Sequence, residues 1–136
     1  MAYMEKAAEL VRLHEGLRLR PYHCTAGKLT IGYGRNLDDK GISQAEADLM
    51  LMADLAECEQ DLSGFHWWDR LSENRKAVLI DMRFNLGGAG LRQFKAMLVC
   101  IALGDYAGAA REMLDSRWAR QVGNRADELS KLMRDG

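Results

Sequence analysis

The sequence predicts an α+β fold in which a small N-terminal β-hairpin lobe is joined by a long helix to a larger, all-helical C-terminal lobe. Two observations lead to this prediction. Short extended segments separated by glycines are confined to about residues 16–34, whereas apolar residues recur at helical spacings of three and four through most of the remaining chain. The single proline, Pro21, falls within the extended region and leaves the rest free to be helical.

The chain of 136 residues is long enough to bury one core and too short for two ordinary domains. We therefore expect one domain over residues 1–136, with the hairpin lobe at about 15–60 and the helical lobe at about 61–136 plus the N-terminal helix. Hydrophobic residues make up 48% of the chain and charged residues 29%, a composition typical of folded proteins and not of disordered ones.

The first predicted helix covers residues 3–14, where one helical stripe is apolar. Gly16 supplies the residue that can adopt the left-handed conformation just past a helix end. Glu15 then lies on the last turn, where the partial negative charge of the helix end disfavours an ionised carboxylate. A glutamate at this unfavourable position indicates a chemical role.

Two extended segments, residues 17–22 and 28–33, follow this helix and flank a turn at residues 24–27. Glycine at the end of that turn can take the positive φ that a tight turn requires. The pattern predicts a two- or three-stranded antiparallel ribbon.

The folded ribbon can bring Glu15, Cys24 and Thr30 together on one side of a cleft. Their spacing resembles that of the phage lysozymes of glycoside hydrolase family 24, in which the middle position is aspartate or cysteine. The Glu-Gly-Leu block at residues 15–17 and the Thr-Ile-Gly-Tyr-Gly block at residues 30–34 add to the resemblance.

A long helix is predicted from Ser43 to about Asp61, since Ser43 and Glu46 form a capping box and Ser63-Gly64 ends the pattern. This helix would connect the hairpin lobe to the rest. The aromatic cluster that follows is expected to anchor packing, with stacking on sugar rings as the alternative; it comprises Phe65, Trp67 and Trp68. Further helices are predicted at 77–86, 91–103, 106–115 and 125–134. Ser72, Asp105 and Asn124 are the expected N-terminal caps of the first, third and fourth of these helices.

This order of elements also resembles the phage lysozyme fold, and the similarity extends through residues 79–87, 116–118 and 124–126. The resemblance implies site residues by position. The catalytic residues would be Glu15, Cys24 and Thr30. Substrate would be bound by Asn36 and Phe84. A second layer around the catalytic residues would include Arg125, next to the catalytic glutamate, and Asn85.

Hydrolysis of a glycosidic bond needs an acid for the leaving oxygen and a group that brings water or a nucleophile to the other face of the sugar. Glu15 is the acid that the hairpin offers. A free thiol has a pKa of about 8.5 and carries little charge near neutral pH unless its surroundings lower that value. Two roles for Cys24 stay open: it positions water for inversion, or it attacks as a thiolate with retention.

Other functions are less well supported by the residues. His14 and His23 flank the proposed site but lack the spacing of zinc ligands, so we expect no metal and no cofactor. Nucleic-acid-binding motifs are absent, and the net charge of −1 does not favour such a partner. A catalytically silent peptidoglycan-binding protein of the same fold is the alternative to an enzyme.

The charge pattern, the termini and the cysteines suggest where the protein acts. Residues 12–35 hold five basic residues and one acidic one, a net charge of +4, and residues 36–65 hold one basic residue and eight acidic ones, a net charge of −7. A basic rim favours an anionic polymer, with a solvated charged face as the alternative. The longest apolar run, residues 97–103, is too short to span a bilayer, and the N-terminus does not resemble a signal peptide.

Three widely spaced cysteines are typical of reduced thiols in a reducing compartment. Together with these features, the resemblance implies a monomer made in the host cytoplasm, without stable membrane association, that hydrolyses peptidoglycan after a holin or similar export partner releases it.

Overall fold

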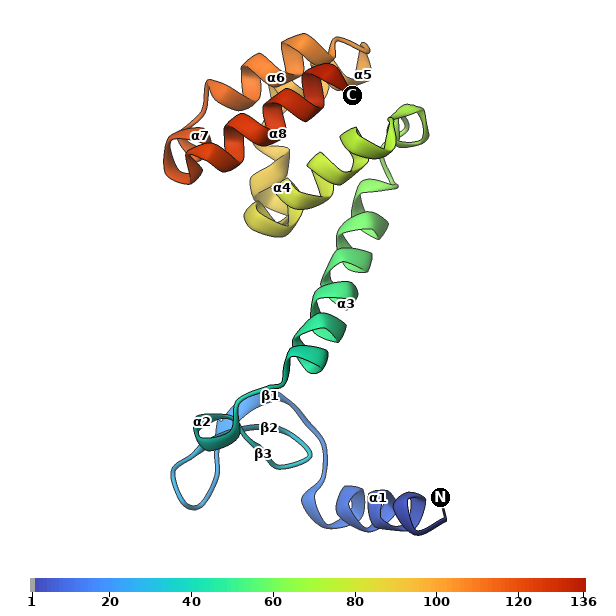
Figure 1. Ribbon diagram of the computed structural model, residues 1–136, viewed down its shortest axis with the longest axis vertical. Coiled ribbons are helices and arrows are strands. Elements are labelled where there is room, and N and C mark those ends of the chain that lie inside the picture. The colour runs from blue at the N-terminus through green and yellow to red at the C-terminus, as the bar shows by residue number, and fades with distance from the viewer. Residues whose placement is uncertain (1) are drawn as a thin grey trace. The chain divides into compact units, whose positions relative to one another are not determined.

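The computed structural model describes residues 2–136 and divides the chain into two compact units, the sheet unit up to Leu49 and the helical unit Met50–Gly136 (Figure 1). Helix α3, Gln44–Leu62, begins in the first unit and ends in the second. The α+β class is confirmed, with a small antiparallel sheet on the N-terminal side and helices after it. The limits of the predicted lobes stay a prediction.

Helix α1, Ala2–Glu15, opens the sheet unit. The backbone N–H of Gly16 donates to the carbonyl of Arg12 at 3.0 Å, and Gly16 has a φ of 71°. This left-handed glycine ends the helix as the sequence predicts. Glu15 is therefore the last residue of α1.

The sheet has the order β1-β2-β3 and is antiparallel throughout, with strands β1 at Arg18–His23, β2 at Leu29–Gly32 and β3 at Arg35–Asn36. An irregularity interrupts the register of β1 between its first residue and Tyr22. The predicted antiparallel ribbon is confirmed, and it includes the third strand.

The register of the sheet aligns three side chains. Tyr22 of β1 lies opposite Thr30 of β2, and Thr30 lies opposite Asn36 of β3. Residues directly opposite one another in antiparallel strands point to the same face. Thr30 is therefore in the middle of a row on one face of the sheet.

Short helix α2, Leu37–Lys40, follows β3 directly and is capped by Asn36, whose Oδ1 accepts from the backbone N–H of Asp39 at 3.0 Å. The predicted capping box of α3 is also present. Ser43 Oγ accepts from the N–H of Glu46 at 3.2 Å, and Glu46 Oε1 accepts from the N–H of Ser43 at 2.9 Å.

The aromatic cluster after α3 lies inside the helical unit. Trp67 is 2% exposed and Trp68, in the short helix η1 at Trp68–Arg70, is 5% exposed. The ring of Phe65 stacks on that of Trp67 with centroids 4.7 Å apart. Burial of both tryptophans confirms that the cluster anchors packing.

Residues 73–135 form the remaining five helices of the helical unit: α4 Glu73–Arg92, α5 Lys95–Ala102, α6 Tyr106–Leu114, α7 Arg117–Val122 and α8 Asn124–Asp135. Two predicted caps are confirmed. Ser72 Oγ accepts from the N–H of Arg75 at 3.2 Å, and Asp105 Oδ1 accepts from the N–H of Gly108 at 2.9 Å.

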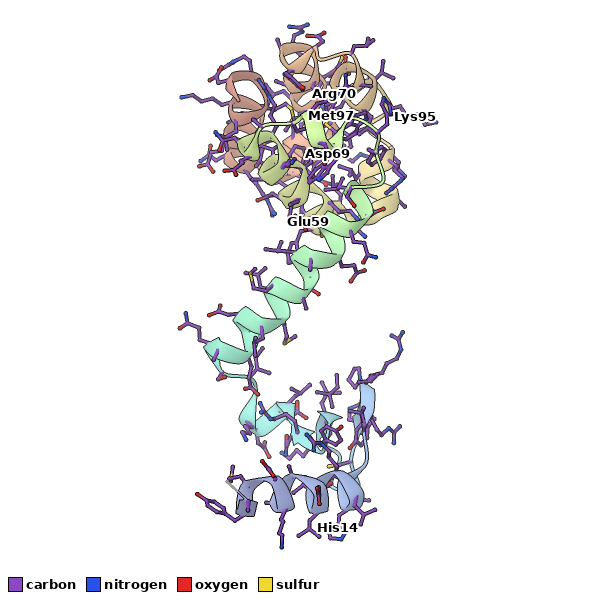
Figure 2. The ribbon with its side chains drawn as sticks, turned by 90° about the vertical axis from the view of Figure 1, so that its right-hand side faces the viewer. His14, Glu59, Asp69, Arg70, Lys95 and Met97 are labelled. Atoms are coloured by element: carbon purple, nitrogen blue, oxygen red, sulfur yellow. The ribbon has the colours of Figure 1, made fainter. Side chains whose placement is uncertain are left out.

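Helix α6 packs against both α5 and α8 (Figure 1). Met97 of α5 is fully buried inside the unit, whereas Lys95, two residues earlier, is exposed (Figure 2). The core of the unit consists of fully buried apolar side chains from α3 to α8, among them Leu62, Val78, Leu79, Met82, Leu91, Met97, Ile101, Met113 and Met133.

The prediction of one helix over 91–103 is wrong. Helix α4 kinks at Gly87, which has φ 77° and ψ 169°, then resumes to Arg92, and α5 starts only after Phe94. Phe94 leaves the helical conformation with a ψ of 56°. Its ring packs edge-on against Trp118, with centroids 5.9 Å apart, so a tertiary contact overrides the local helical pattern.

The end of the chain differs in two further ways. Helix α7 occupies a stretch for which no helix was predicted, and Ser116 Oγ caps it by accepting from the N–H of Ala119 at 3.0 Å. Asn124 does not cap α8, because Gly123, with a φ of 59°, occupies the cap position and Asn124 is already helical. The positive φ of Gly123 lets α8 start directly after α7.

The Arg35–Glu46 ion pair generates the first testable prediction. Arg35 holds the pKa of Glu46 at about 2, helped by the N–H and hydroxyl of Ser43. A carboxyl whose pKa is lower in the folded state stabilises the fold above its unfolded pKa of about 4.3 and loses this effect as the pH falls towards 2. Urea unfolding should therefore show Glu46→Gln to be less stable than wild type at pH 6, with a difference that shrinks below about pH 4.5.

The matched control is Asp48→Asn, two residues along α3, because Asp48 forms no ion pair within residues 2–136. A destabilisation of Glu46→Gln that is the same at pH 6 and pH 2.5 would show that the ion pair does not contribute.

Candidate active site

The carboxylate of Glu15 lies against the backbone of Gly34, in the turn between β2 and β3. A Cβ atom at Gly34 would be 2.8 Å from Glu15 Oε2 and 3.1 Å from its Cδ, closer than such atoms approach. Gly34 also has a φ of 75°, which side chains other than glycine rarely adopt. The absence of a side chain at position 34 therefore creates the space that the Glu15 carboxylate fills.

Cys24 begins the turn between β1 and β2. Its backbone N–H donates to the Lys28 carbonyl at 2.9 Å, and the N–H of Gly27 donates to the Cys24 carbonyl at 2.8 Å. Gly27 has the positive φ, 78°, that the turn requires. These contacts fix the Cys24 backbone, while the side chain is partly exposed.

Thr30 is joined to Cys24 through the same carbonyl. Its Oγ1 donates to Lys28 O at 2.8 Å, and the residue is only 3% exposed. The Lys28 carbonyl thus accepts two hydrogen bonds, one from the Cys24 backbone and one from the Thr30 hydroxyl. The structure brings these two predicted site residues together.

The environment of the Cys24 thiol favours its ionised form. The backbone N–H of Lys28, followed by that of Ala26, lowers the pKa of Cys24 below the ordinary thiol value. Partial burial opposes the shift, and the neighbouring Thr30 hydroxyl adds to it. Backbone N–H groups directed at one sulfur stabilise a thiolate as they stabilise other anions.

Glu15 lies in the same unit but beside a different turn. Within residues 2–49, no hydrogen bond links Glu15 to Cys24 or Thr30, and its carboxylate lies against Gly34. Asn36 lies opposite Thr30, and its amide is occupied in capping α2. Its predicted contact with substrate stays a prediction.

The other predicted residues lie in the helical unit. Phe84 is 46% exposed on α4, and Asn85 Oδ1 accepts from Trp118 Nε1 at 2.7 Å. Arg125 forms an ion pair with Asp81 Oδ1 at 2.8 Å. Asn85 and Arg125 therefore have structural partners in their own unit, and their roles around Glu15 stay predictions.

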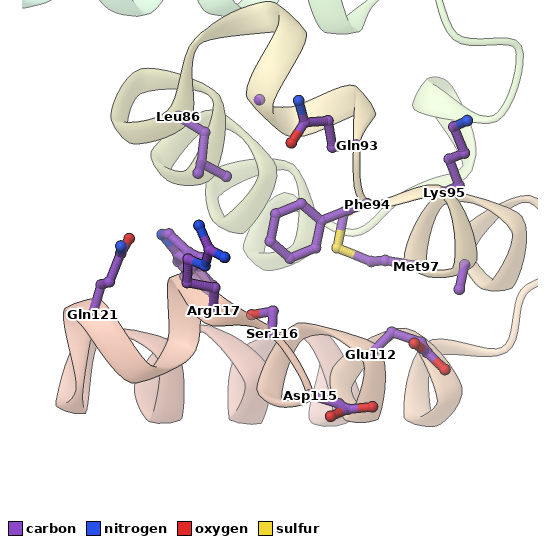
Figure 3. A pocket seen from close by; sticks show the side chains of 13 residues that line it. Leu86, Gln93, Phe94, Lys95, Met97, Glu112, Asp115, Ser116, Arg117 and Gln121 are labelled. Atoms are coloured by element: carbon purple, nitrogen blue, oxygen red, sulfur yellow. The ribbon is translucent and has the colours of Figure 1, made fainter.

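The helical unit also contains a pocket of about 400 Å³ that the sequence analysis missed (Figure 3). Phe94 and Trp118 contribute aromatic surface, while Lys95, Glu112 and Arg117 contribute charges of both signs. Such a lining suits a ligand that carries both ammonium and carboxylate groups. The Ser-Arg-Trp motif was visible in the sequence, but the break at Phe94 that shapes the pocket was not.

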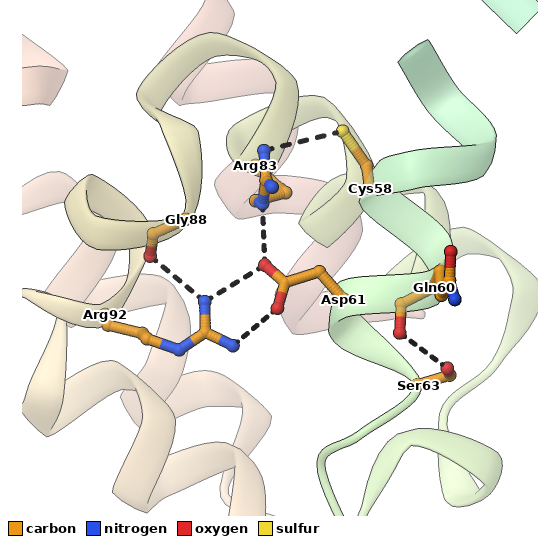
Figure 4. A network of polar contacts seen from close by, with 7 residues as sticks. All are labelled: Cys58, Gln60, Asp61, Ser63, Arg83, Gly88 and Arg92. Atoms are coloured by element: carbon orange, nitrogen blue, oxygen red, sulfur yellow. Dashed lines mark hydrogen bonds and ion pairs between the residues drawn. The ribbon is translucent and has the colours of Figure 1, made fainter. Parts of the chain in front are cut away.

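A polar network holds the end of α3 to α4 (Figure 4). Asp61 pairs with Arg83 Nε at 2.7 Å and with Arg92 through two contacts of 2.7 and 3.0 Å, and Arg92 also donates to Gly88 O at 3.1 Å. Hydrogen bonds from Arg92 and, with a smaller effect, from Arg83 hold the pKa of Asp61 at about 2. The network holds the segment of α4 beyond the kink, which contributes Gly90 to the lining of the pocket.

Two absences apply to the described chain. Residues 2–136 contain no cluster of three His, Cys, Asp or Glu side chains that could hold a metal ion. In the same range, no helix is both long enough and apolar enough to cross a membrane.

Comparison with known proteins defines the class. The phage lysozyme family matches residues 12–134, and the chain belongs to this family. The endolysin of Acyrthosiphon pisum secondary endosymbiont phage 1 is 32% identical over 88% of this chain and 82% of its own length. Probable T4-type lysozyme 1 of Dictyostelium discoideum is 25% identical over 94% of this chain and 93% of its own length.

A third relative, the pre-baseplate central spike protein Gp5 of Enterobacteria phage T4, is 27% identical over 95% of this chain. The chain spans only 28% of the length of that protein. The family and the endolysin relative confirm the resemblance found in the sequence and support a glycosidase role.

The contact between Gly34 and Glu15 generates the second prediction. Gly34→Ala should displace the Glu15 carboxylate and lower the rate of cell-wall clearing about tenfold to a hundredfold, since misplacement of a reacting group by about 1 Å costs rate of this order. Gly41→Ala is the control, because Gly41 also has a positive φ, 62°, but no atom within 4 Å of an added Cβ.

Both variants should lose similar thermal stability through backbone strain, and only Gly34→Ala should lose activity. Equal activity in the two variants would show that the position of Glu15 does not depend on Gly34.

Proposed function

We propose that this protein is an endolysin that hydrolyses the β-1,4 bond between N-acetylmuramic acid and N-acetylglucosamine in bacterial peptidoglycan and so lyses the host cell. The observation that carries this proposal is the sheet unit itself. It presents an exposed glutamate at a helix end together with a partly exposed cysteine in a turn and a hydrogen-bonded threonine hydroxyl on the following strand, in a chain that belongs to the phage lysozyme family.

Glu15 is the proton donor to the leaving oxygen in this proposal. Its carboxylate is fixed on one side by the Gly34 backbone and is otherwise exposed, so a sugar oxygen can approach it. General acid catalysis by a positioned carboxyl contributes about a hundredfold to ten thousandfold in rate. Thr30 would orient water or substrate beside it.

Cys24 supplies the negative charge that an aspartate supplies in other members of the family. A neutral thiol could not do so, but the Lys28 and Ala26 N–H groups lower the pKa of Cys24 and favour the thiolate. The thiolate would stabilise positive charge as it develops on the sugar ring, and it is also the form that can direct a water or attack the anomeric carbon.

The helical unit would hold the substrate in place. We propose that Phe84, exposed on α4, contacts the glycan, and that the pocket with charges of both signs receives the peptide attached to muramic acid. Asn36 would contact sugar from the sheet unit. Arg125 and Asn85 would support the site without touching the substrate.

The biological setting follows from the same proposal. The protein would be made in the host cytoplasm as a monomer and reach the periplasm through a holin or similar export partner. It would need no cofactor and no metal, since the reaction uses only a proton donor, a negative charge and water.

The third prediction concerns Glu15→Gln. The amide has nearly the same shape but cannot donate the proton, so the rate of clearing of permeabilised Gram-negative cells should fall at least about a hundredfold. Glu9→Gln is the matched control, because Glu9 is exposed on the same helix, well before the helix end that carries Glu15. Its activity should equal that of wild type.

A Glu15→Gln protein that folds and retains more than a tenth of wild-type activity would show that the acid lies elsewhere. If wild type binds purified peptidoglycan but releases no reducing sugar from it, the protein is instead the catalytically silent wall-binding protein of this fold.

A further inference from the structure

The kink at Gly87 divides α4 into a long half before it and a short half after it. Gly87 has φ 77° and ψ 169°, and the helix resumes only for residues 88–92. Glycine rotates about its backbone bonds more freely than any other residue, and so short a helical segment is not stable by itself. The orientation of the short half therefore depends on its contacts with the rest of the helical unit.

Both halves of α4 line the pocket of about 400 Å³. Leu86 comes from the long half, Gly90 comes from the short half, and Gln93 follows directly after it. Figure 3 shows Leu86 and Gln93 on one side of the pocket and Ser116 and Arg117, at the start of α7, on the opposite side. The angle of the kink therefore sets the distance between these two sides.

Asp61 of α3 holds one arginine on each side of the kink (Figure 4). Its Oδ2 accepts from Nε of Arg83, in the long half, at 2.7 Å. Both of its oxygens accept from Arg92, in the short half, at 2.7 and 3.0 Å. A carboxylate that receives two N–H groups of one guanidinium has a defined orientation relative to it. Asp61 thus links the two halves directly.

The other contacts of the short half support this link. Gly88 lets the ion pairs lie against the backbone, since an added Cβ would be 3.3 Å from Asp61 Oδ2. Arg92 also donates to Gly88 O at 3.1 Å and lies over the Phe65 ring, 5.1 Å from its centroid. Leu91 is fully buried, but apolar burial is non-directional and does not fix an orientation as hydrogen bonds do. The directional side-chain contacts of the short half are those of Arg92.

We propose that Asp61 is a positioning residue for ligand binding: by holding Arg83 and Arg92 together it fixes the angle at Gly87 and keeps the pocket at the width that its ligand requires. The identity of the ligand rests on the proposed function, in which the pocket receives the peptide attached to muramic acid. Without Asp61 the short half would sample several orientations. Only a fraction of them would bind the peptide, which weakens the apparent affinity.

Hydrogen exchange of the free protein tests the link without any ligand. Asp61→Asn keeps the size of the side chain and removes its charge, and should speed amide exchange in residues 88–94 about threefold to tenfold while exchange in α8 stays unchanged. Glu59→Gln is the matched control, because Glu59 is exposed on the same helix and forms no ion pair in the described part of the chain, residues 2–136. Equal exchange in residues 88–94 of wild type and Asp61→Asn would overturn the proposal.

Peptide binding is measured by calorimetry on the full chain, with the tetrapeptide alanyl-glutamyl-diaminopimelyl-alanine as the probe. Asp61→Asn should raise its Kd about threefold to tenfold, and Glu59→Gln should leave it unchanged. Arg92→Gln alters a side chain that is 44% exposed, keeps the contact between Arg83 and Asp61, and should raise Kd to a similar extent. Addition of Arg92→Gln to Asp61→Asn should change Kd little further, because both substitutions break one link.

A loss of thermal stability with an unchanged Kd in both single variants would overturn the proposal, since Asp61 would then only stabilise the fold. Arg92→Gln covers the case in which Asp61→Asn fails to fold, because exchange and Kd can be measured on it alone. If wild type does not bind the tetrapeptide, the pocket is not a peptide site, and both its place in the proposed function and the ligand named here are wrong. Faster exchange in Asp61→Asn would in that case still support the link across the kink.

Discussion

The sheet unit depends on the hydrogen bonds and the ion pair that the Arg35 guanidinium forms. From β3 it donates to the Gly41 carbonyl at 3.1 Å and pairs with both carboxylate oxygens of Glu46. One side chain thus fixes the last strand, the end of α2 and the first turn of α3. Because Asn36, the next residue, lies opposite Thr30, this anchoring also fixes the strand that carries the buried hydroxyl.

The site is assembled from two turns of this anchored sheet, and each contributes through its backbone. At the β2–β3 turn, the missing side chain of Gly34 makes room for the Glu15 carboxylate. At the β1–β2 turn, the backbone N–H groups of Lys28 and Ala26 lower the pKa of Cys24 and so favour its charge. Backbone groups cannot move independently of the fold, so in the proposed mechanism both side chains would be positioned before substrate binds.

Local sequence signals predicted a large part of this structure. Gly16 ends α1, while Ser43 with Glu46, Ser72 and Asp105 cap their helices, because each cap depends on residues three positions apart. Cys24 and Thr30 were expected together and do share an acceptor. The break at Phe94 was missed because it depends on Trp118, and the Asp61 network because Arg83 and Arg92 lie 22 and 31 residues away. Neither is encoded in a local pattern.

The central claim is that Cys24 acts as a negative charge, and substitution by residues of equal size tests it most directly. Cys24→Asp and Cys24→Asn have nearly the same shape and differ in charge. Initial rates of reducing-sugar release from purified peptidoglycan should place Cys24→Asp within about tenfold of wild type and Cys24→Asn at least about tenfold below Cys24→Asp. Equal rates for the two variants, with equal thermal stability, would contradict the account.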